Sequence, residues 1–159
     1  MKHLLAFPLA LAILPVLAFA QGERAAGTIK GQLMPQAVAT KDAPAAGGPY
    51  SQAIKAGEFV FVAGQVPRDP ATNKVIEGDI SAQTDRVLRN IAAILTAAGT
   101  SMDRVVRTTV YLKNVSDFAK MNDVYATYFK ATRPARTTIC VADLPAAGAL
   151  LEIDVIALQ

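Results

Sequence analysis

Two charged residues stand in sequence contexts that would allow a chemical role. Arg136 lies in Pro134-Ala135-Arg136-Thr137-Thr138, where a loop is expected to enter a strand, and Glu152 interrupts the apolar run from Leu150 to Ile156. An arginine so placed can bind a substrate carboxylate through two parallel hydrogen bonds, which contribute roughly 1.5–3 kcal/mol. A partly buried Glu152 would have a raised pKa and could hold or transfer a proton. Residue types alone favour plainer roles: a surface salt bridge for Arg136 and a solvated outer-face position for Glu152.

The scarce residue types exclude most familiar catalytic machinery. His3 is the only histidine and lies in a segment expected to be removed, so Ser-His-Asp and Cys-His mechanisms and most zinc sites lack their histidine. Cys140 is the only cysteine, which excludes an internal disulfide, and between Ile139 and Val141 it is expected to be a small core hydrophobe. No acidic cluster has the spacing of metal ligands. We therefore expect no metal site, and carboxylates, Tyr, Ser, Thr, Lys and Arg remain as catalytic groups.

The amino terminus has the composition of a signal peptide. Lys2 and His3 precede an apolar run from Leu4 to Phe19, and Ala18-Phe19-Ala20 has the small-x-small pattern that a signal peptidase cleaves. The run is shorter than the roughly 20 residues of a spanning helix, although an uncleaved membrane anchor is the alternative. We expect residues 1–20 to be removed, which predicts a secreted or periplasmic protein with no stable membrane association afterwards.

The remainder is expected to form one domain, residues 37–159, after a flexible Gly- and Ala-rich leader at 21–36. The formal net charge is +3, and the basic residues are scattered, without runs or interleaved aromatics. Nucleic-acid-binding surfaces carry denser and more clustered positive charge. We therefore expect no nucleic-acid partner.

The periodicity of apolar residues predicts an α+β fold. The expected elements, in chain order, are strands at Tyr50–Ala56 and Phe59–Ala63 around a Gly57-Glu58 turn, a helix from its N-cap Asp79 to Ala98, a strand at Val105–Leu112, a helix capped by Ser116 and ended by Arg133-Pro134, and strands at Thr137–Ala142 and Leu150–Leu158. The second helix is expected to turn Phe118, Met121, Tyr125 and Tyr128 inward. Each helix has one apolar stripe, so both are expected on the same face of one mixed sheet.

Alternation along the strands predicts a second sheet face that needs a partner. In the last strand Leu151, Ile153, Val155 and Ala157 alternate with Glu152 and Asp154. In the strand at 105–112, the expected division is Val106, Thr108, Val110 and Leu112 on one side, and Val105, Arg107, Thr109 and Tyr111 on the other. Self-association would cover the mixed face and would build semi-polar clefts between subunits.

Several motifs resemble those of the reactive intermediate deaminase family (RidA/YjgF). They are Ala43-Pro44-Ala45-Ala46-Gly47-Gly48-Pro49-Tyr50-Ser51-Gln52-Ala53, Ala63-Gly64-Gln65-Val66-Pro67, the Asn122 of Phe118-Ala119-Lys120-Met121-Asn122, Pro134-Ala135-Arg136 and Leu151-Glu152-Ile153. They occur in the family's order and spacing from about Ala37 to Gln159. The resemblance therefore covers essentially the whole expected domain.

The resemblance implies a chorismate-mutase-like fold assembled as a homotrimer, with ligand sites in clefts between subunits. It also implies a cofactor-free reaction, the hydrolysis of enamine and imine acids such as 2-aminoacrylate and 2-iminobutanoate to 2-oxo acids and ammonia. In that reaction Arg136 would bind the carboxylate of the small substrate, and Glu152 would position or activate the attacking water. The implied substrate-binding positions are Tyr50, Ala63, Gly64, Asn122 and Thr138.

The chain departs from the family pattern at three positions. Ala63 stands where many members carry serine, Thr138 where bacterial members often carry cysteine, and Gly47 where isoleucine is common; each departure could alter substrate choice. Three alternatives to the deaminase reaction remain: carboxylate binding without turnover, a holdase role, and ribonuclease activity. Scattered positive charge and the missing histidine make the ribonuclease the least favoured of these.

Overall fold

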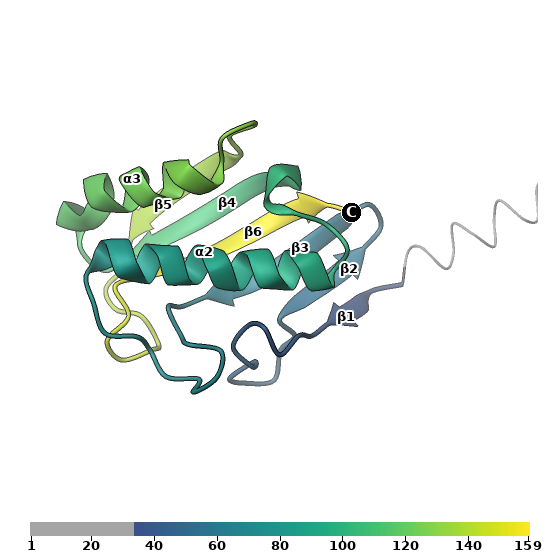
Figure 1. The fold of residues 1–159 in the computed structure, drawn as a ribbon, viewed down its shortest axis with the longest axis horizontal. Coiled ribbons are helices and arrows are strands. Elements are labelled where there is room, and N and C mark those ends of the chain that lie inside the picture. Colours follow the sequence, from purple (N-terminus) through teal and green to yellow (C-terminus); the bar gives the residue numbers. More distant parts are fainter. Residues whose placement is uncertain (1–33) are drawn as a thin grey trace, which may run out of the picture. The chain divides into compact units, whose positions relative to one another are not determined.

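The computed structural model describes residues 34–159, which form one mixed β-sheet with two α-helices on one of its faces (Figure 1). The strands are β1 (Gln36–Val38), β2 (Ala53–Ala56), β3 (Phe59–Gln65), β4 (Val105–Leu112), β5 (Ala135–Cys140) and β6 (Leu151–Leu158). Their order across the sheet is β1-β2-β3-β6-β4-β5. The helices are α2 (Ile80–Ala97) and α3 (Phe118–Tyr128), and neither is long and apolar enough to cross a membrane. The predicted fold class is confirmed, whereas residues 1–33, with the expected signal peptide and most of the leader, lie outside the described residues.

Neighbouring strands are antiparallel except for β4 and β5, which are parallel and are connected through α3. A parallel connection needs a crossover, and an α-helix is the usual one. The predicted hairpin joins β2 to β3, and Gly57 adopts a left-handed φ of 58° in its turn, which glycine tolerates at little cost. The buried faces of the strands and the apolar stripes of the helices form one core.

Helix α2 begins and ends where its sequence predicts. The Asp79 carboxylate accepts a hydrogen bond from the Ala82 amide at 3.0 Å, which satisfies a backbone donor that a helix start leaves free. The apolar stripe is fully buried against the sheet; its largest members are Leu88, Ile91, Ile94 and Leu95. Gly99, with φ of 81°, follows the last turn. This helix is the longest element of the fold and anchors the loops at one edge of the candidate site.

Helix α3 differs from its prediction at both ends. Ser116 does not cap it, because Ser116 lies within a 3₁₀ turn (Val115–Asp117) that precedes the helix. The helix ends at Tyr128 rather than at Arg133-Pro134, because the next residue, Phe129, leaves helical geometry and buries its ring against Tyr125, with ring centroids 4.5 Å apart. Met121 and Tyr125 face the core as expected and Tyr128 is half-buried, but Phe118 is 42% exposed.

The middle strand, β4, contains a bulge that alternation could not reveal. Its register against β6 shifts between Val105 and Arg107, so Val106 is the extra residue. Val105 therefore joins Thr108 on the buried face, and Val106 is exposed, which reverses both predicted positions. From Thr108 onward, and throughout β6, the predicted alternation is confirmed.

Three further expectations need correction at the two sheet edges. The predicted leader contains the start of β1, because Gln36 pairs with Lys55 of β2. Strand β5 runs from Ala135 to Cys140 instead of from Thr137 to Ala142, because its pairing with β4 begins at Arg107. Cys140 is exposed rather than buried, since it ends the outermost strand.

Candidate active site

A cavity of about 230 Å³ opens beside β3 and β6, enclosed by the loops that follow β1, β3 and β5. Its wall includes Tyr50, Gly64 and Glu152, three residues predicted from the sequence, together with Gln52, Gln65 and Arg68. Glu152 comes from the centre of the sheet, where Leu151 and Ile153 on either side of it are fully buried. The alternation of β6 therefore turns this carboxylate to the face opposite the helices and toward the cavity.

Gly64 is in contact with the Glu152 carboxylate. A Cβ atom at position 64 would lie 1.8 Å from Oε1 and 2.8 Å from Cδ of Glu152, so any side chain here would displace the carboxylate. The register between β3 and β6 shifts between Val62 and Gln65, which places Gly64 in an irregular stretch of the strand. The glycine thus leaves room for the Glu152 carboxylate at the cavity. Ala63, the adjacent predicted residue, is half-buried and does not line the cavity.

The surroundings of Glu152 favour its protonated form. Burial, and then the neighbouring carboxylate of Asp154, raise the pKa of Glu152. Tyr111 lies directly opposite Glu152 across the β4–β6 pair, and its hydroxyl donates to Asp154 Oδ2 at 3.0 Å. Burial and this hydrogen bond raise the pKa of Tyr111, so the phenol stays a donor. Glu152 is therefore a carboxyl group that can exchange a proton nearer to neutral pH than an exposed glutamate can.

The loop after β1 is held in place by the buried amide of Gln52. Its Nε2 donates to the carbonyl of Pro44 at 2.7 Å, and its Oε1 accepts from the Thr40 amide at 2.6 Å. Tyr50 closes the same loop, since its hydroxyl accepts a hydrogen bond from the Gly47 amide at 3.0 Å. The cavity wall formed by this loop is therefore set by side-chain-to-backbone hydrogen bonds.

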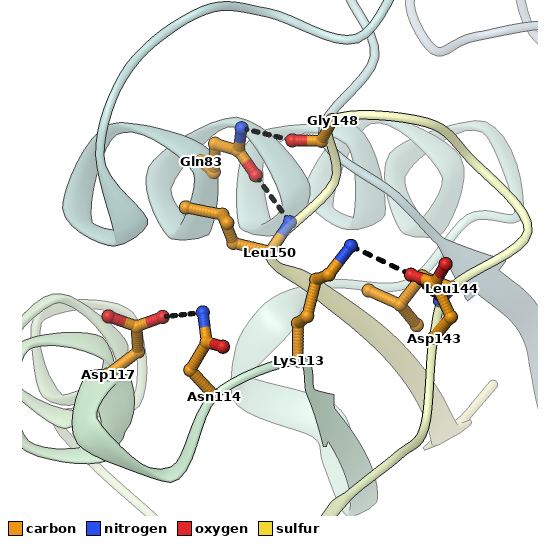
Figure 2. Close-up of polar contacts among 8 residues, drawn as sticks. All are labelled: Gln83, Lys113, Asn114, Asp117, Asp143, Leu144, Gly148 and Leu150. Atoms are coloured by element: carbon orange, nitrogen blue, oxygen red, sulfur yellow. Dashed lines mark hydrogen bonds and ion pairs between the residues drawn. The ribbon is translucent and has the colours of Figure 1, made fainter.

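The loop between β5 and β6 is anchored to α2 by a second buried amide, Gln83 (Figure 2). Gln83 donates to the Gly148 carbonyl at 3.0 Å and accepts from the Leu150 amide at 2.8 Å. Lys113 forms an ion pair with Asp143 at 2.8 Å at the other end of the loop. Gln83 also donates to the Ile76 carbonyl at 3.2 Å, so one side chain fixes two of the three loops that border the cavity, those after β3 and β5.

Arg136 lines a different cavity, of about 540 Å³, between α3 and the start of β5. Asn122 and Tyr125 of α3 are part of the same wall. The Arg136 guanidinium carbon lies 4.6 Å from the centroid of the Tyr125 ring and 5.8 Å from that of Phe118, a cation–π arrangement worth roughly 0.5–1 kcal/mol at an exposed site. Within residues 34–159 no carboxylate forms an ion pair with Arg136. The guanidinium is thus oriented by aromatic rings, and no carboxylate of these residues neutralises it.

Arg136 and Glu152 lie on opposite faces of the sheet in one subunit. Arg136 pairs with Thr108, whose side chain is buried beneath α3 and lies 2.8 Å from the Tyr125 hydroxyl. Thr138, two residues along β5, is on the same face as Arg136, and its buried hydroxyl has no hydrogen-bond partner among residues 34–159. The predicted residues thus form two groups: Tyr50, Gly64 and Glu152 at one cavity, and Arg136 and Asn122 at the other, with Thr138 on the Arg136 face.

Sequence reasoning missed the polar residues that shape the first cavity. Gln52, Gln65 and Gln83 are nearly fully buried, but only Gln83 has a signal in the sequence, an amide within the buried stripe of α2. Alternation places Asp154 on the same side of the last strand as Glu152, but it does not reveal that Tyr111 of β4 lies opposite Glu152. In residues 34–159, no group of three or more His, Cys, Asp and Glu side chains is arranged to hold a metal ion.

Comparison with known proteins places this arrangement in a large group of relatives. A family model described as Endoribonuclease L-PSP matches residues 40–159. A RutC family protein of Pyrococcus horikoshii is 54% identical over 124 residues, which are 78% of this chain and 98% of that protein. Reactive Intermediate Deaminase A, a chloroplastic protein of Arabidopsis thaliana, is 46% identical over 77% of this chain and 65% of its own length. The crystal structure of Escherichia coli TdcF with bound serine superposes with a TM-score of 0.73 at 38% identity, covering 78% of this chain and 98% of that one.

Proposed function

Because the chain belongs to the Endoribonuclease L-PSP family, to which RidA and RutC proteins also belong, we propose that it hydrolyses small imine and enamine acids to 2-oxo acids and ammonia. The observation that carries the proposal is Glu152, a half-buried carboxyl group with a raised pKa at the wall of a cavity. The relative named as a reactive intermediate deaminase supports the reaction class. The bound serine in TdcF supports a small amino-acid-like ligand.

The proposed chemistry needs one proton carrier and one carboxylate clamp. Glu152 takes a proton from a water molecule as the water oxygen bonds to the imine carbon, and it then passes this proton to the imine nitrogen. The resulting carbinolamine collapses, the carbon–nitrogen bond breaks, and ammonia leaves as the 2-oxo acid forms. An enamine substrate first becomes the imine, when the carbon of its double bond that does not carry the nitrogen accepts a proton. The imine then follows the same steps. Since an imine is already electrophilic, acid/base assistance of roughly a hundred- to ten-thousand-fold is a sufficient role for Glu152.

We propose that the carboxylate clamp is Arg136 of a neighbouring subunit in a homotrimer. The opposite placement of Arg136 and Glu152 in one subunit supports this arrangement, because it keeps the two side chains from a shared cleft. The sheet face opposite the helices supports association, because Phe61 is 43% exposed on it and Ile139 is 44% exposed on edge strand β5. Closed rotational symmetry would then repeat the same composite site at each interface.

The first test measures release of 2-oxo acid and ammonia from freshly generated 2-aminoacrylate and 2-iminobutanoate. Acceleration by the wild-type protein and its loss in Arg136→Ala would support the deaminase. If Glu152→Gln also removes turnover but still binds small carboxylates, the glutamate acts in the reaction and not in binding. Binding by the wild-type protein without acceleration would instead favour a carboxylate-binding module.

A complementation experiment tests the composite site. Arg136→Ala and Glu152→Gln are each expected to be inactive, and co-expression of the two would create trimers in which some interfaces carry both wild-type residues. Random mixing is expected to restore about a quarter of the wild-type activity. No recovery from mixed trimers would mean that both residues act within one subunit.

We also propose that residues 1–20 export the protein, as their composition suggests. Expression with the complete amino terminus in a Gram-negative host, followed by fractionation and intact-mass measurement, tests this. A periplasmic product that starts at Gln21 is expected, and a cytoplasmic product that retains residue 2 would refute it.

A further inference from the structure

Arg68 is a second guanidinium at the candidate site, and it belongs to the same cavity as Glu152. It lies in the turn after β3, three residues beyond Gln65, and is half-buried. Unlike Arg136 it needs no neighbouring subunit to reach the Glu152 cavity. One cavity therefore combines a carboxyl group suited to proton transfer with a fixed positive charge.

Hydrogen bonds within the turn and from α2 hold the backbone around Arg68 in place. Arg68 forms an antiparallel bridge with Val75, and its carbonyl accepts from Asn90 Nδ2 of α2 at 2.9 Å. Across the turn, the Asp69 carboxylate accepts hydrogen bonds from the amides of Ala71 and Thr72, each at 3.0 Å. The turn that carries Arg68 is thus a rigid support and not a free surface loop.

The Arg68 side chain is anchored at one point and otherwise unpaired within residues 34–159. Its Nη1 donates to the Asn73 carbonyl at 2.7 Å, and no carboxylate of these residues forms an ion pair with it. Glu152 shares the cavity but makes no ion pair with Arg68, and the influences on the Glu152 pKa are burial and Asp154. The remaining donors of the guanidinium fork are consequently available for an anion, and a carboxylate matches their geometry.

We propose that Arg68 binds a carboxylate on the side chain of the substrate, so that this protein prefers imino acids with two carboxyl groups. This inference rests on the deaminase proposal, in which Arg136 holds the carboxylate next to the imine carbon and Glu152 acts at that carbon. A substrate that reaches Arg68 as well must carry a second carboxylate. The adjoining wall has room for the longer side chain, because it is built from small residues, Ala45, Ala46 and Gly47.

The test compares a dicarboxylic imine with a monocarboxylic one. Iminosuccinate, generated by oxidation of aspartate, and 2-iminobutanoate are supplied to the wild-type protein, to Arg68→Gln and to Lys74→Gln. Lys74 is the matched control because it lies in the same turn, carries the same charge, is exposed and does not line the cavity. A charge-assisted pair lost in Arg68→Gln is expected to lower kcat/KM for iminosuccinate roughly ten- to a hundredfold, with little change for 2-iminobutanoate.

Two outcomes overturn the inference. If Arg68→Gln lowers kcat/KM equally for both substrates, Arg68 binds the carboxylate that the two substrates share. If Arg68→Gln and Lys74→Gln have the same kcat/KM for each substrate, Arg68 binds no substrate carboxylate. Calorimetric titration of the 2-oxo acid products, oxaloacetate and 2-oxobutanoate, keeps this test separate from the deaminase proposal. Tighter binding of oxaloacetate that is lost in Arg68→Gln would support the cation's role even if no imine is hydrolysed, and equal binding of the two acids would refute it.

Discussion

At the scale of single residues, the proposed chemistry depends on one carboxyl group and the few atoms around it. Glu152 has Gly64 against its carboxylate, Asp154 beside it on β6, and Tyr111 across from it on β4. Gly64 sets where the carboxylate lies, and burial and then Asp154 raise the pKa of Glu152. The influences of Gly64 and of Asp154 can each be removed by a small substitution that leaves Glu152 in place.

The first prediction concerns pH. If Glu152 acts as a base, it must be deprotonated, so kcat/KM should fall as the pH decreases through its pKa. Burial and Asp154 raise that pKa above the ordinary 4.5, so the decline should occur above pH 4.5. Asp154→Asn removes the like charge but keeps an oxygen that can accept the hydrogen bond from Tyr111. In this variant the fall of kcat/KM on the acidic side of the pH profile should move to lower pH. The exposed Asp103→Asn should leave the profile unchanged; a fall that does not move in Asp154→Asn would contradict the assignment.

The second prediction concerns Gly64→Ala. The added methyl group would lie 1.8 Å from Glu152 Oε1, so the carboxylate must move. Moving a reacting group by about 1 Å lowers kcat on the order of a hundredfold. The backbone should remain unstrained, because Gly64 is not among the residues with positive φ. In a Glu152→Gln background the same substitution should have no further effect on kcat, and an additional loss there would show that Gly64 acts through something else.

At the scale of elements, buried amides connect the loops of the candidate site to the sheet and to α2. Gln83 binds Gly148 and Leu150 on one loop and Ile76 on another. Because it is 2% exposed, water cannot replace these bonds. Helix α2 thus contributes to the site through the position of the loops, although it contributes no reacting group.

The third prediction is that Gln83→Leu destabilises the fold. The Gly148 carbonyl and the Leu150 amide would lose their partner, and leaving a buried group unsatisfied costs about 1–3 kcal/mol. Denaturant unfolding should show this loss, whereas Thr96→Leu, on the exposed side of the same helix, should stay within about 0.5 kcal/mol. An unchanged unfolding free energy in Gln83→Leu would mean that the loops do not depend on this amide.

At the scale of the whole molecule, the sheet face opposite the helices is the feature that one subunit leaves unexplained. Phe61 is 43% exposed there and pairs across the sheet with Ile54 and Ile156, so apolar groups from three adjacent strands are neighbours. The polar residues Glu152, Asp154 and Tyr111 continue the same face. Our proposed trimer would cover the apolar part and bring Arg136 of one subunit to Glu152 of another.

The fourth prediction is that Phe61→Lys weakens assembly. A charge in a buried interface is unfavourable unless it is paired, so the variant should shift toward monomer and lose turnover together with assembly. Val115→Lys is the control, because Val115 is 76% exposed before α3. Sedimentation equilibrium measures the oligomeric state, and circular dichroism checks that the variant is folded. A monomeric wild-type protein, or a Phe61→Lys variant that remains trimeric, would refute the interface.

The sequence alone determined the elements whose signals are local. The stripe of α2, its Asp79 cap and the alternation of Leu151, Ile153, Val155 and Ala157 around Glu152 were readable because each depends on residues a few positions apart. Motif resemblance added the family, which the comparisons then showed. The short strand β1 escaped prediction because three residues carry no period.

Tertiary structure alone decided how these residues meet. Which face Val105 and Val106 take depends on a bulge that forms only when β4 pairs with β6. The separation of Arg136 from Glu152 follows from the register of β5 on β4 and of β4 on β6. The contact between Gly64 and Glu152 and the place of Arg68 in their cavity join residues far apart in the chain. Strand pairing and loop anchoring are long-range interactions, and no local pattern in the sequence encodes them.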